Sequence, residues 1–134
     1  MADDVLWHPS VNYKKSSKMY GFLTRMSEKY HLPDNEYHTV HGWSVEHPDQ
    51  FWAEIWDYCN IKHSRKYDQV VDDPAKMPGA KWFKGARLNF AENLLKRKDD
   101  HLAIIFWGED SVKQEITYAE LFEQVRSVDA GFRK

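Results

Sequence analysis

Residues 82–95 read WFKGARLNFAENLL, and this stretch says more about the fold than any other part of the chain. Its two leading aromatic residues precede Gly85, where the backbone can take a positive φ or approach another segment closely. Asn89 with Glu92 three residues later is a capping-box pattern, in which each side chain satisfies a backbone N–H at a helix start. The helix it predicts has three apolar residues on one face: Phe90, Leu94 and Leu95.

Two further helices are predicted before this stretch. Ser16 or Ser17 can cap the first, in which apolar residues recur at helical spacing: Met19, Phe22, Leu23, Met26 and Tyr30. It should end at His31-Leu32, because Pro33 removes a donor and restrains the residue before it. Residues 34–42 are expected to form a loop. The second helix should begin at His47-Pro48, and its broad apolar stripe comprises Phe51, Trp52, Ile55, Trp56 and Cys59.

The remaining segments alternate between extended and helical patterns. Residues 67–71 are expected to be extended, residues 72–80 a loop, and the capped helix should run from Phe90 to about Lys96. Residues 101–107 and 112–116 read as two strands joined at Gly108-Glu109-Asp110-Ser111. Thr117 with Glu120 is a second capping box, and the helix after it has an apolar side of Leu121, Phe122, Val125, Val128 and Phe132.

This pattern predicts a mixed α/β fold. A helical amino-terminal extension over residues 1–99 should be followed, over residues 100–134, by the first β-hairpin and helix of a larger α/β domain. A lone hairpin is marginal in water, and the last helix lacks a closing Gly, Asn or Pro, so the domain is expected to be truncated.

Aromatic residues are abundant for so short a chain, at 15% of 134 residues with six tryptophans. A buried aromatic side chain removes about 150–250 Å² from water, and a small domain has little interior in which to hide many of them. We therefore expect an apolar surface that docks onto something larger.

Charge and cysteine content exclude several classes of partner. Nineteen basic and 21 acidic residues give a formal net charge of −2, which creates no field to attract nucleic acid or an anionic membrane. Cys59 is the single cysteine and cannot form an internal disulfide. Residues 1–4 are acidic with no apolar run after them, which argues against a secretory signal. The expected location is the cytosol.

Residues 82–95 resemble the WFxGxxLNxAEN segment near the amino terminus of AMP-forming acyl-CoA synthetases. The AENLL ending is most similar to the branch that activates acetoacetate. Other matches follow in the family's order: Trp7-His8-Pro9-Ser10, Trp43-Ser44-Val45, Phe51-Trp52-Ala53-Glu54 with Trp56, Ser64-Arg65, Tyr67-Asp68, Val70-Val71-Asp72, and Ile116-Thr117-Tyr118-Ala119-Glu120-Leu121. The resemblance covers essentially the whole chain, but only the beginning of the family's length.

The resemblance implies a parent enzyme that uses ATP, Mg²⁺ and coenzyme A. In this family a small-molecule acid attacks the α-phosphate of ATP, and the thiol of coenzyme A then displaces AMP. Acetoacetate is the expected acid, with acetate or another short acid as the alternative. The partner of this chain would then be the remainder of the catalytic domain.

The family's Ser/Thr/Gly-rich phosphate loop, ribose-binding acid and carboxy-terminal lysine are not present in this sequence. The two closest of its six glycines, Gly79 and Gly85, are too far apart for a phosphate-cradling loop. We therefore assign no catalytic, cofactor-binding or metal-binding residue, and expect the chain to be inactive alone. The alternative is a naturally truncated, non-catalytic module that binds the full enzyme or another partner.

Four features could still suggest a site, and each has a more ordinary explanation. The histidines His38, His41 and His47 follow no known zinc spacing, so polar loop residues are favoured over a metal site. Cys59 could be a nucleophile, but its place on an apolar stripe favours an inert, buried thiol.

The other two features are basic and aromatic. Lys96-Arg97-Lys98 could contact a phosphate, but the adjacent Asp99 and Asp100 favour a solvated helix end. The tryptophan-bearing helix could stack on a ligand, although a stripe at helical spacing is more often a packing face.

Within residues 82–95 itself, Gly85, Asn89 and Asn93 are expected to join the extension to the catalytic domain structurally. Arg87 is the one side chain there that could reach a phosphate, and we do not assign it to a site.

Overall fold

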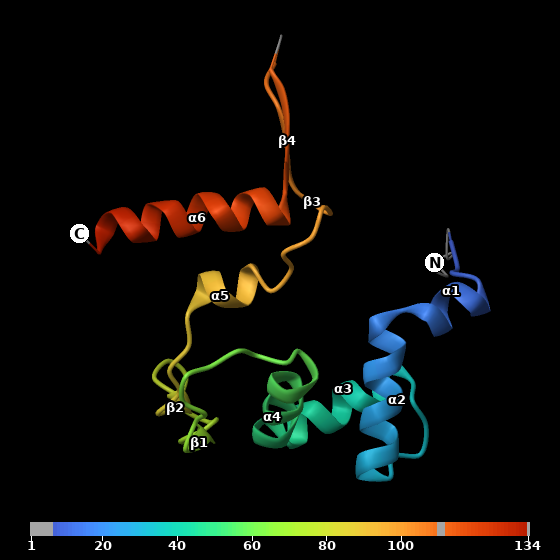
Figure 1. The fold of residues 1–134 in the computed structure, drawn as a ribbon. Helices are drawn as coiled ribbons and strands as arrows, with labels where there is room; N and C mark the ends of the chain where they lie inside the picture. Colours follow the sequence, from blue (N-terminus) through green and yellow to red (C-terminus); the bar gives the residue numbers. More distant parts are fainter. Residues whose placement is uncertain (1–6, 110–111, 134) are drawn as a thin grey trace. The chain divides into compact units, whose positions relative to one another are not determined.

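The computed structural model describes residues 7–109 and 112–133, in which six helices and two small antiparallel sheets form (Figure 1). This confirms the mixed α/β fold class. The chain divides into two compact units. The first unit comprises Met1–Ile61 and Tyr67–Gly85, and the second comprises Lys62–Lys66 and Ala86–Lys134. The predicted domain boundary between residues 99 and 100 concerns the whole parent and stays a prediction.

Four helices make up most of the first unit: α1 (Val11–Ser16), α2 (Lys18–Tyr30), α3 (Tyr37–Glu46) and α4 (Pro48–Tyr58). As predicted, Ser17 caps α2, accepting a hydrogen bond from Tyr20 N at 3.1 Å. The helix ends at His31, which takes the left-handed conformation at φ 53°. Pro48 occupies the first turn of α4, again as predicted.

The core of the first unit lies between α2 and α3. Phe22, Leu23 and Met26 of α2 are buried against Val40 of α3, and Met26 is fully enclosed. Partly buried apolar residues surround this cluster: Tyr30, Leu32, Trp43, Phe51 and Ile55. Burial of this apolar face, rather than helix propensity, is what stabilises short helices of this kind.

The prediction that residues 34–42 form a loop is wrong for most of its length, because α3 begins at Tyr37. Two side chains shape the turn before it: Asp34 Oδ1 accepts from Glu36 N at 3.0 Å, and Asn35 Nδ2 donates to Thr24 Oγ1 at 2.9 Å. The helix then buries Val40, so tertiary packing overrides the low helix propensity of Gly42. The six-residue α1, capped by Ser10, was not predicted either.

A two-stranded sheet completes the first unit. Strand β1 (Gln69–Val71) pairs antiparallel with β2 (Trp82–Lys84), with Gln69 opposite Lys84 and Val71 opposite Trp82. The extended segment at 67–71 and the loop at 72–80 were predicted, whereas β2 was not assigned as a strand. Its length of three residues is too short for an alternating pattern to be recognised.

The second unit contains α5 (Phe90–Leu94), β3 (Leu102–Trp107), β4 (Lys113–Thr117) and α6 (Tyr118–Phe132). The hairpin and both helices were predicted, and Thr117 and Glu120 form the complete capping box of α6. The predicted turn at 108–111 lies partly outside the described residues. No helix in the described ranges is long and apolar enough to cross a membrane.

Candidate functional site

The stretch from Trp82 to Leu95 passes from the first unit into the second after Gly85. Gly85 has φ 86°, the left-handed region that favours glycine, and a Cβ built on it would lie 2.2 Å from Asp68 Oδ2. Its neighbour Lys84 accepts a hydrogen bond from Asp68 N at 2.8 Å. Both the conformation and the close approach expected of Gly85 are therefore present.

The side chains of Asn89 and Asn93 both form hydrogen bonds with main-chain groups. Asn89 Oδ1 accepts from Glu92 N at 3.2 Å and so caps α5. Asn93 pairs with both main-chain groups of Lys62: its Oδ1 accepts from Lys62 N, and its Nδ2 donates to Lys62 O, each at 2.8 Å. The prediction of a shared apolar face on α5 holds only in part, because Leu95 is buried whereas Phe90 and Leu94 are exposed.

The main chain of Arg87 forms hydrogen bonds with residues 64 and 65. Arg87 N donates to Arg65 O at 2.9 Å, and Arg87 O accepts from Ser64 N at 2.8 Å. Together with Asn93, this bridge ties Lys62–Lys66 to the segment around α5, all within the second unit. The backbone of this stretch thus organises the unit, while the Arg87 side chain is exposed.

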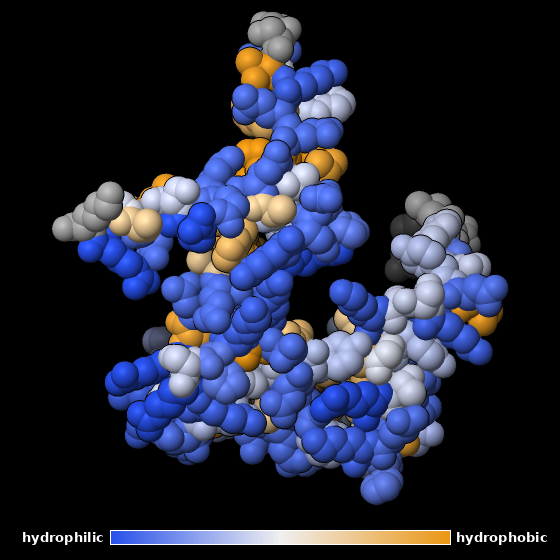
Figure 2. All heavy atoms as spheres, viewed as in Figure 1, coloured by the Kyte–Doolittle hydropathy of each residue, from blue (hydrophilic) through white to orange (hydrophobic). Residues whose placement is uncertain are grey.

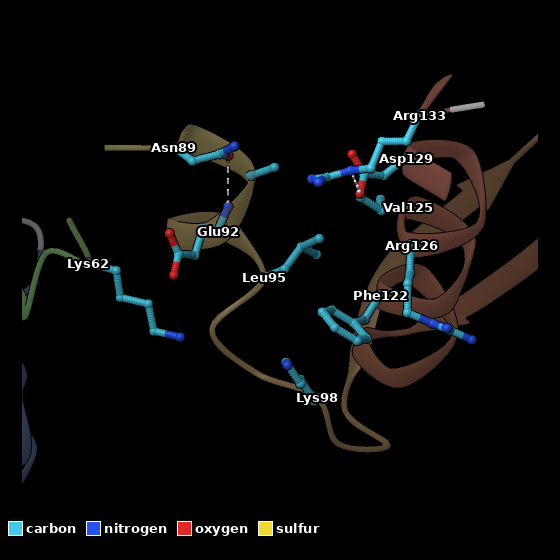
Figure 3. Close-up of a pocket in the computed structure, with 11 residues that line it drawn as sticks. Lys62, Asn89, Glu92, Leu95, Lys98, Phe122, Val125, Arg126, Asp129 and Arg133 are labelled. Carbon is cyan, nitrogen blue, oxygen red and sulfur yellow. Dashed lines mark hydrogen bonds and ion pairs between the residues drawn. The ribbon is translucent and has the colours of Figure 1, made fainter. Parts of the chain in front are cut away.

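A hollow of about 510 Å³ lies between α5 and α6 in the second unit (Figure 3). Leu95 faces Phe122 and Val125 of α6 across it. Polar and charged side chains stand around this apolar centre: Lys62, Asn89, Glu92, Lys98, Arg126, Asp129 and Arg133.

Three of the four basic side chains that line this hollow contact neighbours of their own. Arg133 Nε lies 2.9 Å from Asp129 Oδ2, and Arg126 lies 2.7 Å from Glu123 Oε2. Lys98 Nζ sits 3.8 Å from the centre of the Phe122 ring. An apolar centre whose two arginines are already paired with carboxylates suits the packing of another polypeptide segment better than the binding of a polyphosphate.

In the basic run at residues 96–98, the side chains of Arg97 and Lys98 do not point to a common site. Lys98 reaches the Phe122 ring, whereas Arg97 forms an ion pair with Asp99 at 3.2 Å. Desolvation would raise the pKa of Asp99, but the hydrogen bond from His101 N and the Arg97 ion pair outweigh it and hold that pKa below its ordinary value. Arg97 and Lys98 are exposed, as expected, but the prediction that this run ends a helix is wrong, because α5 stops at Leu94 and residues 96–98 lie in the connection after it.

The three histidines do not converge. His41 stacks on Tyr37 with ring centres 5.7 Å apart, while His47 lies against Trp43 at 5.1 Å. Across residues 7–109 and 112–133, no group of three His, Cys, Asp or Glu side chains is arranged to hold a metal ion. His38 and His41 lie on α3 rather than in the expected loop.

The expectation that Cys59 is buried is wrong. Helix α4 ends at Tyr58, and Cys59 is its exposed C-cap residue. The apolar stripe does not continue through the last turn, because the buried residues of α4 are Glu54 and Trp56.

The tryptophans of α4 serve as packing residues. Trp56 is buried between Tyr67 and Phe83, with ring centres 5.1 and 5.0 Å away. Trp52 is partly exposed and lies 6.1 Å from Trp82 of β2. These edge-on and tilted contacts favour the packing interpretation over a ligand platform.

Sequence reasoning missed a buried carboxylate in the same helix. Glu54 is only 3% exposed and accepts hydrogen bonds from Arg25 Nε at 3.3 Å, Tyr30 Oη at 3.2 Å and Lys29 Nζ. Burial alone would raise the pKa of Glu54, but Lys29, Arg25 and Tyr30 outweigh it and lower that pKa. A signal was present in the sequence: a lone acid inside an apolar stripe, with two cations four residues apart on α2.

Comparison with known proteins identifies related chains. The family model described as the acetyl-coenzyme A synthetase N-terminus matches residues 37–94. Malonamoyl-CoA synthetase vrtB of Penicillium aethiopicum is 44% identical over 98% of this chain and 19% of its own length. Acetoacetyl-CoA synthetase of Xenopus tropicalis is 37% identical over all of this chain and 20% of its own.

A solved structure agrees with these sequence matches. Acetoacetyl-CoA synthetase from Streptomyces lividans superposes with a TM-score of 0.83 at 32% identity, over 97% of this chain and 21% of that one. The chain thus spans about a fifth of the length of the curated relatives it matches.

Proposed function

Because the chain belongs to the acyl-CoA synthetases as their amino-terminal part, we propose that its parent is an ATP-dependent acetoacetate–CoA ligase. The overall reaction would convert acetoacetate, ATP and coenzyme A into acetoacetyl-CoA, AMP and pyrophosphate. The observation that carries this proposal is the 33–37% identity to acetoacetyl-CoA synthetases over nearly all of this chain and about a fifth of theirs.

The described residues of this chain do not themselves fit ATP, Mg²⁺ or coenzyme A. The arginines of the hollow between α5 and α6 are paired with Asp129 and Glu123, and no set of metal ligands converges in the described ranges. We derive no catalytic step from these side chains. ATP, Mg²⁺ and coenzyme A belong to the proposal for the parent enzyme, whose remaining sequence would hold them.

A second candidate acid is malonamate, favoured by the 44% identity to a malonamoyl-CoA synthetase. Acetoacetate and malonamate have the same skeleton: each is a short acid with a carbonyl carbon one methylene away from the carboxylate. They differ in the terminal group, a methyl in acetoacetate and an amide nitrogen in malonamate. A site built to hydrogen-bond that amide would discriminate strongly between them, whereas an apolar pocket would favour the methyl.

The test is a steady-state assay of the full-length parent with acetoacetate, malonamate, acetate and propionate, following pyrophosphate release and thioester formation. We expect the highest kcat/KM with acetoacetate. A preference for malonamate would select the second candidate, and a preference for acetate or propionate would overturn the assignment of a 3-oxo acid.

The 134-residue chain serves as the companion sample in that assay. It should release no pyrophosphate in response to acetoacetate, because its sequence contains no Ser/Thr/Gly-rich phosphate loop. ATP turnover by the pure chain would contradict this expectation.

A further inference from the structure

Strand β3 is apolar on both of its faces. Ile104 and Phe106 point to one side of the hairpin and Ile105 and Trp107 to the other, and all four are between 43% and 72% exposed. A strand with no polar face is typical of the interior of a sheet covered on both sides. Figure 2 shows hydrophobic atoms along the hairpin, which in Figure 1 extends away from α6.

Strand β4 has the opposite composition. Lys113, Gln114 and Glu115 are all exposed, and charged residues such as Lys113 and Glu115 protect the edge strands of natural sheets against further pairing. Within the described residues β3 pairs with β4 alone, so the apolar strand and the polar strand each have one open edge.

The register shows which backbone groups lie on the open edges. Gly108 N donates to Val112 O at 2.7 Å, and the pairs Phe106 with Gln114 and Ile104 with Ile116 continue in the same register. Since hydrogen-bonded and non-hydrogen-bonded pairs alternate in an antiparallel ladder, Ile105 and Trp107 direct their N–H and C=O groups away from β4. Their opposite residues, Glu115 and Lys113, direct theirs away from β3.

We propose that the open edge of β3, at Ile105 and Trp107, pairs with a strand from the remainder of the parent's adenylating domain. Strand β3 then becomes an interior strand covered on both faces, and β4 remains the edge of the completed sheet. The proposal rests on the proposed function for the identity of the occupant. The matched relatives are about five times longer than this chain, which leaves ample polypeptide to supply that strand.

The first test measures amide hydrogen exchange in the full-length parent, resolved to single residues by mass spectrometry with electron-transfer fragmentation. The amides of Ile105 and Trp107 should exchange at least about 100-fold more slowly than those of Lys113 and Glu115. The amides of Ile104 and Phe106 bond to β4, so their exchange rates are the internal reference for a formed ladder. Equal, fast exchange at all four outward amides would overturn the proposal, as would protection of Lys113 and Glu115.

The second test isolates a single backbone N–H in the same full-length protein. Ile105 and Glu115 are directly opposite each other, so Ile105→Pro and Glu115→Pro remove matched outward donors from the two strands. Each is compared with its alanine variant to account for the lost side chain. Ile105→Pro should lower the unfolding temperature clearly below that of Ile105→Ala, whereas Glu115→Pro should match Glu115→Ala. Equal proline effects on the two strands would overturn the proposal.

Failure of this inference and failure of the proposed function would look different. An active ligase with unprotected Ile105 and Trp107 amides would refute the strand pairing alone. A protein with those amides protected but without acyl-CoA synthesis would refute the proposed reaction and leave the pairing in place.

Discussion

Gly85 and Gly42 illustrate two opposite uses of glycine in this chain. Gly85 has φ 86° and lies against Asp68, so an L side chain there is strained and meets the carboxylate at 2.2 Å. Gly42 lies inside α3, where a Cβ would meet nothing within 4 Å.

We therefore expect Gly85→Ala to lower the free energy of unfolding by about 1–3 kcal/mol, from left-handed strain and the contact with Asp68. Gly42→Ala should raise it by roughly 0.5–1 kcal/mol, because alanine is the better residue in a helix interior. Urea titrations followed by circular dichroism compare the two variants with the wild type. A neutral Gly85→Ala would show that the positive φ is not required.

Glu54 is a charged residue that is buried in the first unit. Its carboxylate is almost fully enclosed, while the Arg25 and Lys29 side chains that bind it are about half exposed. The pKa of Glu54 is lowered in the fold, so the ionised form stabilises the folded chain above the unfolded pKa of about 4.3. That contribution is lost as the pH falls through the lower folded pKa.

Glu54→Gln should accordingly destabilise the chain at pH 7 by about 1–3 kcal/mol, since Arg25 and Lys29 lose their partner. Below about pH 4.5 the free energy of unfolding should also fall less steeply with acidification in Glu54→Gln than in the wild type. The difference between the two slopes should be at most roughly 1.4 kcal/mol per pH unit. Urea unfolding at several pH values measures this, with Glu28→Gln on the exposed side of α2 as the control. Identical pH profiles for wild type and Glu54→Gln would contradict the role of the carboxylate.

At the scale of elements, α5 is a helix that local sequence alone could barely maintain. It has five residues, whereas isolated helices shorter than about 12–15 residues are marginal in water. The Asn89 cap, the Asn93 bridge to Lys62 and the burial of Leu95 supply the missing stabilisation. Asn93 also donates to Asn89 O at 3.0 Å, which links the cap to the bridge.

Asn93→Ala should remove both hydrogen bonds to Lys62 and cost about 1–2 kcal/mol of stability in the second unit. Hydrogen exchange at the Lys62 amide should accelerate, while the amides of α2 in the first unit stay unchanged. Asn12→Ala, at an exposed position in α1, is the matched control. Unaltered exchange at Lys62 would show that the Asn93 side chain does not hold this segment.

At the scale of the whole molecule, the two units differ in how much apolar surface they bury. The first unit encloses Phe22, Leu23, Met26, Val40, Trp56 and Val71, whereas among the described residues of the second only Leu95 is a buried apolar side chain. Side chains of β3 and α6 that would line a core remain open, among them Phe106, Val128 and Phe132. Large apolar side chains are also exposed in the first unit, among them Trp7, Tyr37 and Met77, so the expected docking surface of this aromatic-rich chain stays a prediction.

The sequence by itself determined the features that depend on neighbours within a few residues. Ser17, Asn89 and Thr117 cap their helices as predicted, because a cap joins a side chain to a backbone N–H two or three residues away. The hairpin of β3 and β4 follows for the same reason, because two strand-forming segments with a short connection pair locally. The resemblance of residues 82–95 to a segment of the acyl-CoA synthetases also pointed to the family that the comparisons support.

Only the tertiary structure decided what depends on distant residues. Helix α3 exists because Val40 is buried against α2, and the pKa of Glu54 is lowered despite its burial because Lys29 and Arg25 approach it from another helix. Asn93 was recognised in the sequence, but its partner Lys62, 31 residues away, was not. Local hydrogen bonds are encoded by short spacings, whereas burial and ion pairing between elements are set by packing, which no single window of sequence contains.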